Sequence, residues 1–125
     1  HEFVCARAGT PDVAPSHEVM ARLAGTNAAA ARAREALALF VRLAGEVCGD
    51  LALTLLPFGG VFLIGGMARA MAPHAREFGF AEAFRDKGRF SGFMKQFPVT
   101  LVTDDDAALI GCALHLEGVR RREAG

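Results

Sequence analysis

Apolar residues recur every three or four positions between Ala33 and Leu55, with charged residues between them. This period predicts a long helix that packs centrally in the fold, with its apolar side covered by other elements. Gly45 and Gly49 lie one turn apart inside this pattern. Because a glycine in a helix interior costs about 1 kcal/mol relative to alanine, we expect another element to approach the helix closely there.

A shorter amphipathic pattern precedes the long helix. Residues 16–23 begin with a candidate capping serine and place apolar side chains on one side of a helix that ends at Gly25. Thr26 or Asn27 can then cap the long helix. Residues 1–15 contain glycine and prolines without a sustained period, which predicts a loop or tag-like terminus.

Two apolar runs predict β-strands. Residues 61–64 lie between pairs of glycines and have the pattern of a strand buried on both faces, and residues 99–102 form a second run after Pro98. Short helical patterns lie between them at 70–78, 81–86 and 89–96. Strands separated by helices favour parallel neighbours, so the predicted fold class is α/β. Since two strands make a poor sheet, strands from sequence outside this chain are expected.

The chain is predicted to end in a helix over 107–116 that stops at Gly118. Asp104, Asp105 and Asp106 precede it and point in different directions, so we interpret Asp106 as a helix cap and predict no metal site there. The arginines at 120–122 follow the helix end, where the helix dipole favours cations.

The composition favours one compact unit without a charged partner. Of 125 residues, 52% are hydrophobic, and 14 Lys and Arg balance 14 Asp and Glu. Bulk charge therefore predicts neither a nucleic-acid nor a membrane partner. Residues 51–68 carry no charge, but Pro57 and two glycine pairs interrupt them, which favours a soluble protein over a membrane helix.

The cysteines and the first residues indicate in which cellular compartment the protein is expected. Cys5, Cys48 and Cys112 lack the paired spacing of a disulfide framework or zinc knuckle, so we expect them to be reduced and the protein to be cytoplasmic. The chain begins at His1 without a methionine or a signal-peptide pattern, which we interpret as a cut or tagged boundary.

Three stretches carry a resemblance to a known family: 58–67 (FGGVFLIGGM), 79–90 (GFAEAFRDKGRF), and 97–99 (FPV) continuing to 109–111 (LIG). Their order and spacing resemble the carboxy-terminal end of bacterial glucokinases, over about 15–118. The stretch 86–90 (DKGRF) is the most specific identifier. We interpret its charged residues as solvated or paired at the surface.

The resemblance implies the carboxy-terminal part of an actin-like ATPase (ribonuclease H-like) domain, mostly helical with two or more strands. On this reading residues 1–15 are the loop or tag-like terminus, and 16–103 are part of the glucokinase large domain. Residues 104–125 form a carboxy-terminal helix that returns toward the small domain. The apolar face of that helix is then expected to lack its partner in this chain, and self-association into a homodimer could cover it.

The implied activity of the parent protein is ATP-dependent phosphorylation of glucose to glucose 6-phosphate, the first step of glycolysis, with ATP and Mg²⁺. The family's phosphate-binding loop, its Asn-Asp pair that supplies the base, and its glucose-gripping residues have no match in this chain. We therefore expect a fragment without catalytic residues, which is inactive in isolation. Alternatives are a sugar kinase of another specificity, a sugar-responsive regulator, or a non-catalytic nucleotide-binding module.

Glycines mark the candidate nucleotide contacts. Gly65 and Gly66 follow the first strand at its carboxyl end, where open α/β sheets bind ligands and bare backbone can approach them. In glucokinases this turn lies against the adenosine part of ATP, so the resemblance implies backbone contacts from Gly65, Gly66 and Met67. Gly111 is a second candidate, with helix packing as the alternative. The family pattern there is Pro-Gly-Leu-Leu-Gly-Ser-Gly, whereas residues 107–113 are AALIGCA.

No other local constellation predicts chemistry. His17, His74 and His115 have no nucleophile or carboxylate at a triad spacing, and His1 with Cys5 lies in the terminal segment. Neither glycine cluster matches a Walker-type loop or a dinucleotide motif. We therefore expect no metal ligands in this chain.

Overall fold

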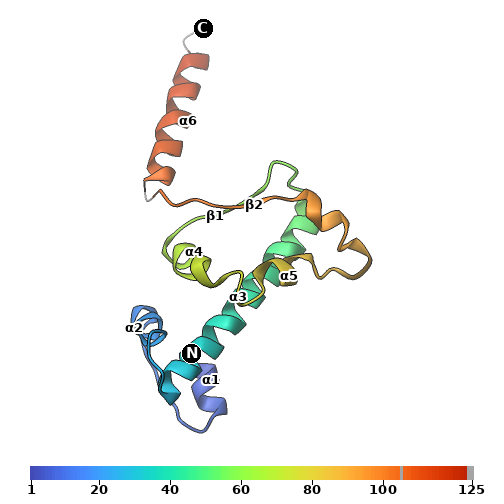
Figure 1. Cartoon of the computed structure of the whole chain (residues 1–125). Coiled ribbons are helices and arrows are strands. Elements are labelled where there is room, and N and C mark those ends of the chain that lie inside the picture. The colour runs from blue at the N-terminus through green and yellow to red at the C-terminus, as the bar shows by residue number, and fades with distance from the viewer. Residues whose placement is uncertain (105, 124–125) are drawn as a thin grey trace.

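The computed structural model describes residues 1–104 and 106–123. A long central helix carries the shorter elements along its length, and the last helix extends away from them (Figure 1). The elements in chain order are α1 (Glu2–Arg7), α2 (Ser16–Arg22), α3 (Ala28–Leu55), β1 (Val61–Leu63), α4 (Gly66–Met71), η1 (Ala72–His74), α5 (Phe80–Arg85), η2 (Gly88–Phe90), η3 (Phe93–Gln96), β2 (Val99–Leu101) and α6 (Ala107–Glu123).

The predicted central helix is confirmed as α3, which has 28 residues. Asn27 caps its amino terminus, because the side-chain Oδ1 accepts a hydrogen bond from the backbone N–H of Ala30 at 2.9 Å. At its other end Leu56 adopts a left-handed conformation with φ 49°, and its N–H donates to the Ala52 carbonyl. Hydrogen bonds of the flanking residues Asn27 and Leu56 therefore define both ends of α3.

The close approach expected at Gly45 and Gly49 is made by α5. A Cβ at residue 45 would lie 2.5 Å from the carbonyl oxygen of Phe80, and one at residue 49 would collide with the carbonyl oxygen of Phe84. The two glycines thus let the backbone of α5 rest directly on α3. This contact compensates for their low helix propensity.

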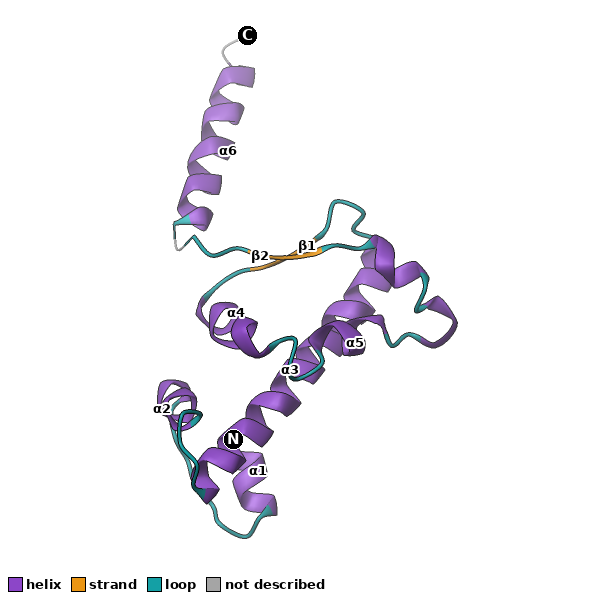
Figure 2. Cartoon of the chain, viewed as in Figure 1, coloured by secondary structure: helices purple, strands orange, loops and turns teal. Residues whose placement is uncertain are grey.

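The two strands pair in parallel, as predicted, with Val61 opposite Val99 and Leu63 opposite Leu101. Figure 2 shows them as a narrow ribbon between α6 and the other helices. Burial of β1 on both faces was a wrong prediction for this chain, since Phe62 is 61% exposed. The core residues of α3 and α5 pack under one face of the sheet, which leaves alternate residues of β1 uncovered.

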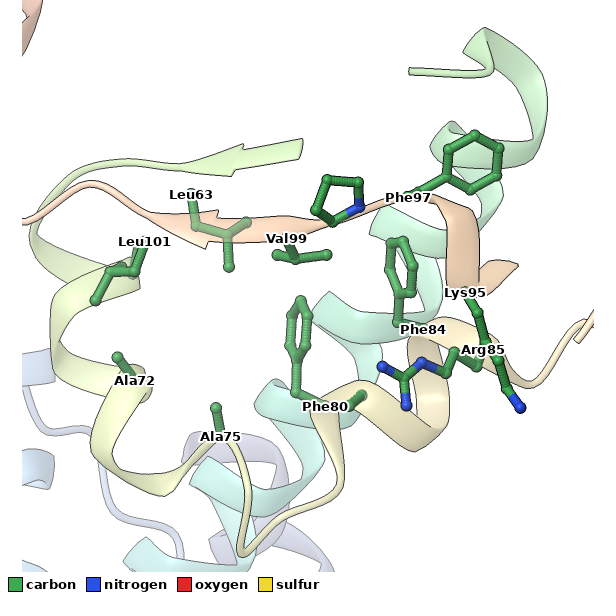
Figure 3. Close-up of a pocket in the computed structure, with 13 residues that line it drawn as sticks. Leu63, Ala72, Ala75, Phe80, Phe84, Arg85, Lys95, Phe97, Val99 and Leu101 are labelled. Atoms are coloured by element: carbon green, nitrogen blue, oxygen red, sulfur yellow. The ribbon is translucent and has the colours of Figure 1, made fainter. Parts of the chain in front are cut away.

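The core lies between α3, α5 and the underside of the sheet. Its buried members are Leu37, Val41, Ala52, Met71, Phe80, Phe84, Met94 and Phe97. Leu63 and Val99 pack against this cluster from the strands, around a cavity of about 380 Å³ that has Arg85 and Lys95 at one end (Figure 3). The lining of this cavity is mainly apolar, with Arg85 and Lys95 as its charged members.

The predicted loop over residues 1–15 was wrong for its first half, because residues 2–7 form α1. Val4 and Cys5 are buried, and α1 contacts α3. Six residues are too few to form a stable helix alone, so burial against α3 stabilises this turn where local pattern did not reveal it.

The last helix, α6, continues past Gly118 to Glu123, so the predicted end at 118 was wrong. An ion pair between Arg121 Nη2 and Glu117 Oε1 at 2.5 Å spans the glycine. None of the described residues of α6 is buried, and Leu109 is 71% exposed. The large apolar side chains Leu109, Ile110, Leu114 and Leu116 of this helix are therefore exposed among the described residues.

Candidate functional site

The turn after β1 presents bare backbone at the carboxyl end of the sheet. Gly65 has φ 101°, a conformation that glycine adopts without strain, and its carbonyl oxygen accepts from the N–H of Arg69 at 3.1 Å. A Cβ at Gly65 or at Gly66 would meet nothing within 4 Å. The absence of side chains at this turn is therefore not required by packing among the described residues, and the space beside it is open to a ligand.

Met67, the third predicted contact, lines a cavity of about 290 Å³. The apolar part of its wall comes from α2 and α3, through Met20, Leu37 and Phe40. Polar groups at its edge include His1, Glu2 and Ser16. An apolar cavity with a few polar groups, next to a bare glycine turn, suits a flat and partly polar molecule such as a nucleobase.

Gly111 is not brought into contact with these residues. It lies on the exposed helix α6, where a Cβ would meet nothing within 4 Å. The parallel pairing of β1 and β2 makes α4 and α6 leave from the same edge of the sheet (Figure 2). The described structure thus groups Gly65, Gly66 and Met67 and leaves Gly111 apart.

Asp104 and Asp106 are joined by a hydrogen bond before α6. Asp104 Oδ1 accepts a hydrogen bond from the N–H of Asp106 at 2.8 Å, and the Asp106 carbonyl accepts from the N–H of Ile110 at 2.9 Å. Asp106 therefore takes the position of a helix cap, while Asp105 lies outside the described residues. The side chain of Asp104 is engaged in this hydrogen bond.

The DKGRF stretch binds to α3 through its lysine. Lys87 Nζ lies 2.7 Å from Asp50 Oδ1 and donates to the carbonyl oxygen of Glu46 at 3.0 Å, with its side chain only 10% exposed. A Cβ at Gly49 would lie 2.6 Å from Lys87 Cε, so the lysine stem crosses α3 at that glycine. Lys87 is thus paired, as expected for this stretch, and its half-buried side chain lies against α3. In the sequence, Gly49 next to Asp50, directly before a charge-free run, is the signal for this contact.

A cluster at the amino end was missed from the sequence. The ligand-type atoms of His1, Cys5 and Asp12 lie within 4.8 Å of one another, and Arg22 donates to Asp12. Hydrogen bonds to Glu18 and then to Asp12 raise the pKa of the Arg22 guanidinium. Elsewhere, burial raises the pKa of the Cys48 thiol. Asp12 lies in a segment without periodicity, so only the folded chain brings it to His1.

Among the described residues, no helix combines the length and apolar character that crossing a membrane needs. The charge-free stretch at 51–68 is divided between the end of α3, a turn, β1 and the start of α4.

Comparison with known proteins gives consistent matches. The family model described as glucokinase matches residues 1–119. The glucokinase of Chromobacterium violaceum is 42% identical over 118 residues, covering 93% of this chain and 33% of that protein. That of Mesorhizobium japonicum is 41% identical over 105 residues, covering 84% and 30%.

A crystal structure of glucokinase from an Antarctic psychrotroph is 34% identical and matches 92% of this chain and 35% of its own, with a TM-score of 0.78. The chain thus spans about a third of the length of these relatives. The matched region also includes residues 1–15, which the sequence alone had assigned to a tag-like end.

Proposed function

The chain belongs to the glucokinase family, and from that premise we propose that it supplies the adenosine-side wall of an ATP-dependent glucokinase. The parent enzyme would phosphorylate glucose to glucose 6-phosphate, the first step of glycolysis. The observation that carries the proposal is the open glycine turn at Gly65 and Gly66, at the carboxyl end of β1 and beside the cavity at Met67. The fold agrees with it, since the α/β structure matches a glucokinase, an enzyme of the actin-like ATPase fold.

The role of the turn is to admit and orient the nucleotide. Backbone atoms at Gly65 and Gly66 can come close to a flat ligand because no side chain stands in front of them. Met67, Leu37 and Phe40 offer an apolar surface that would exclude water from one side of a nucleobase. Such contacts fix where the nucleotide lies and leave bond making and breaking to residues in the rest of the enzyme.

Mg²⁺ does not fit this segment. It prefers oxygen ligands in octahedral geometry, whereas the group of three metal-binding side chains found among the described residues has a thiol, an imidazole and a carboxylate. We propose that the Mg²⁺ bound with ATP is held outside residues 1–123, by the phosphates and other parts of the parent protein.

We propose that phosphoryl transfer is also carried out by other parts of the parent enzyme. Phosphoryl transfer to a sugar hydroxyl needs a positioned carboxylate as base and a cradle for the phosphates. Because neither pattern has a match in this chain, we expect the isolated chain to form no glucose 6-phosphate. For the parent enzyme we propose a cytoplasmic location, ATP and glucose as substrates, and a homodimer as one means of covering α6.

A chimera tests the proposed function. This chain replaces the matching third of the Chromobacterium violaceum protein, and glucose 6-phosphate formation is followed with varied ATP. We expect ATP-dependent phosphorylation by the chimera and none by the isolated chain. A well-folded chimera without activity would contradict the proposal that this chain is part of an active glucokinase. Activity of the isolated chain would contradict the proposal that other segments carry out the chemical step.

Gly66→Val in the chimera tests the site. A side chain at residue 66 has open space in the structure, so the fold should be kept while ligand approach is blocked. We expect KM for ATP to rise about tenfold or more, equivalent to at least about 1.4 kcal/mol of binding, with KM for glucose unchanged. Gly59→Val is the matched control, because Gly59 is equally open but precedes β1. Equal effects of the two substitutions would refute the adenosine contact.

A further inference from the structure

Two metal-binding side chains lie on one face of the first helix. His1 caps α1 and Cys5 lies one turn further, with Cys5 Sγ 3.4 Å from His1 Nε2. Cys5 is fully buried and the His1 side chain is 6% exposed. The thiol and imidazole are thus held together away from solvent. The helix that carries Cys5, α1, lies beside the amino end of α3 (Figure 1).

A third donor comes from the linker between α1 and α2. Asp12 Oδ2 lies 3.4 Å from the same His1 Nε2, and the donor atoms of all three residues lie within 4.8 Å of one another. In tetrahedral zinc sites, bonds of about 2.0–2.3 Å place neighbouring donor atoms about 3.3–3.5 Å apart. The two measured separations therefore match adjacent corners of a zinc coordination tetrahedron.

We propose that His1 Nε2, Cys5 Sγ and Asp12 Oδ2 bind Zn²⁺, with a water molecule as fourth ligand. Nitrogen and sulfur donors with one carboxylate favour zinc over Mg²⁺ or Ca²⁺. The thiolate and the carboxylate together neutralise the charge of the ion, and the cysteine proton is released to solvent when the Zn–S bond forms. The site adjoins the cavity at Met67, which His1 also lines, and it does not depend on the proposed kinase activity.

The guanidinium of Arg22 lies against two of the proposed ligands. Its Nη1 donates to Asp12 Oδ2 and lies 3.1 Å from His1 Nε2. A positive charge is therefore already placed beside these two ligand atoms. Arg22 Nη2 also donates to Glu18 Oε1 at 2.8 Å. When zinc takes Asp12 and His1, Glu18 retains Arg22. Arg22 is therefore a competitor of the ion.

The ion would fasten the amino end of the fold. It would join α1 to the linker that leads to α2, and Val4 of the same helix is buried where α1 contacts α3. His1 also lines the cavity beside Met67, so the tie would fix one edge of that cavity. Such a clamp supplies stability that a six-residue helix lacks by itself.

Titration of the reduced full chain with Zn²⁺, and with Co²⁺ as a spectroscopic probe, tests the proposal. We expect one ion per chain, a thiolate-to-cobalt charge-transfer band, and tetrahedral d–d bands. Asp12→Asn should weaken binding by about tenfold or more, the range found when the shell of a metal site is altered. Cys5→Ser should abolish the charge-transfer band. Cys112→Ser, on the exposed side of α6, is the matched control and should leave both readouts unchanged.

Further variants distinguish Zn²⁺ binding at this site from unspecific metal binding elsewhere on the chain. Asp12 is 32% exposed, so Asp12→Asn should fold even if the buried Cys5→Ser variant does not. Arg22→Gln should tighten Zn²⁺ binding, because it removes the competing cation. Equal affinity of Asp12→Asn and the unmodified chain, or absence of a cobalt–thiolate band, would each overturn the proposal.

Discussion

Gly45 of α3 faces the carbonyl oxygen of Phe80 so closely that a Cβ at residue 45 would lie 2.5 Å from it. The Cβ of Ala83 lies 3.1 Å from the same position and is a second obstacle. Because both obstacles belong to α5, any added atom must push that helix off α3. The packing of the core thus depends on this glycine.

Gly45→Ala is expected to destabilise the chain in spite of the better helix propensity of alanine. Propensity favours alanine by about 1 kcal/mol, whereas displacing a packed backbone costs about 1–3 kcal/mol or more. We expect a net loss of about 1–2 kcal/mol in the free energy of unfolding, measured by urea denaturation. Gly111→Ala is the control, since its Cβ has open space and should stabilise by about 0.5–1 kcal/mol. A stabilised Gly45→Ala would show that α5 does not rest on α3.

Lys87→Met tests whether the DKGRF stretch is held by its lysine. The substitution keeps most of the apolar stem but removes the donors to Asp50 and to the Glu46 carbonyl. We expect a loss of about 1–2 kcal/mol of stability, mainly from the carbonyl left without its charged donor, because Asp50 is 71% exposed and screened by water. Lys95→Met is the control, with an expected change within about 0.5 kcal/mol. Equal denaturation midpoints of the two variants would contradict this role.

Cys48 is expected to react slowly with iodoacetamide and only at raised pH. Burial raises the pKa of its thiol, so the reactive thiolate forms at higher pH than in an ordinary cysteine. The exposed Cys112 of the same chain provides the internal reference, with peptide mass mapping as readout. Modification of Cys48 as early as Cys112 would be inconsistent with the structure.

The raised pKa of Cys48 also predicts how the free energy of unfolding changes with pH. Since the folded chain holds the Cys48 proton more tightly than the unfolded chain, this contribution is fully present below the ordinary thiol pKa, about 8.5. It is lost as pH rises through the higher folded-state pKa. Cys48→Ala should therefore reduce the fall in stability above about pH 8.5, measured by denaturation across that range.

Self-association through α6 is expected at high concentration. Leu109, Ile110 and Leu116 are 71%, 49% and 62% exposed on a helix without a buried residue. Covering them removes apolar surface from water, which favours association. Sedimentation should show a dimer for the unmodified chain and a shift to monomer for Leu109→Asp. A chain that remains monomeric, with Leu109→Asp indistinguishable from it, would refute this surface as the contact.

The sequence by itself determined the local elements and the family. The three-and-four period predicted α3, Asn27 was one of two proposed caps, and two short apolar runs separated by helices predicted the parallel pair of β1 and β2. The glycines at 45 and 49 predicted a close contact before its partner was known. These features could be predicted because each depends on residues close together in the chain, where periodicity, capping and backbone freedom act directly.

Only the tertiary structure decided which distant residues meet. It selected α5 as the partner of Gly45, placed Lys87 against Asp50, and brought Asp12 to His1 and Cys5. It also formed α1 where the pattern predicted a loop, because burial of Val4 and Cys5 against α3 stabilises a turn too short to stand alone. Contacts of this kind arise from the summed packing of the whole fold, which a single stretch of sequence does not record.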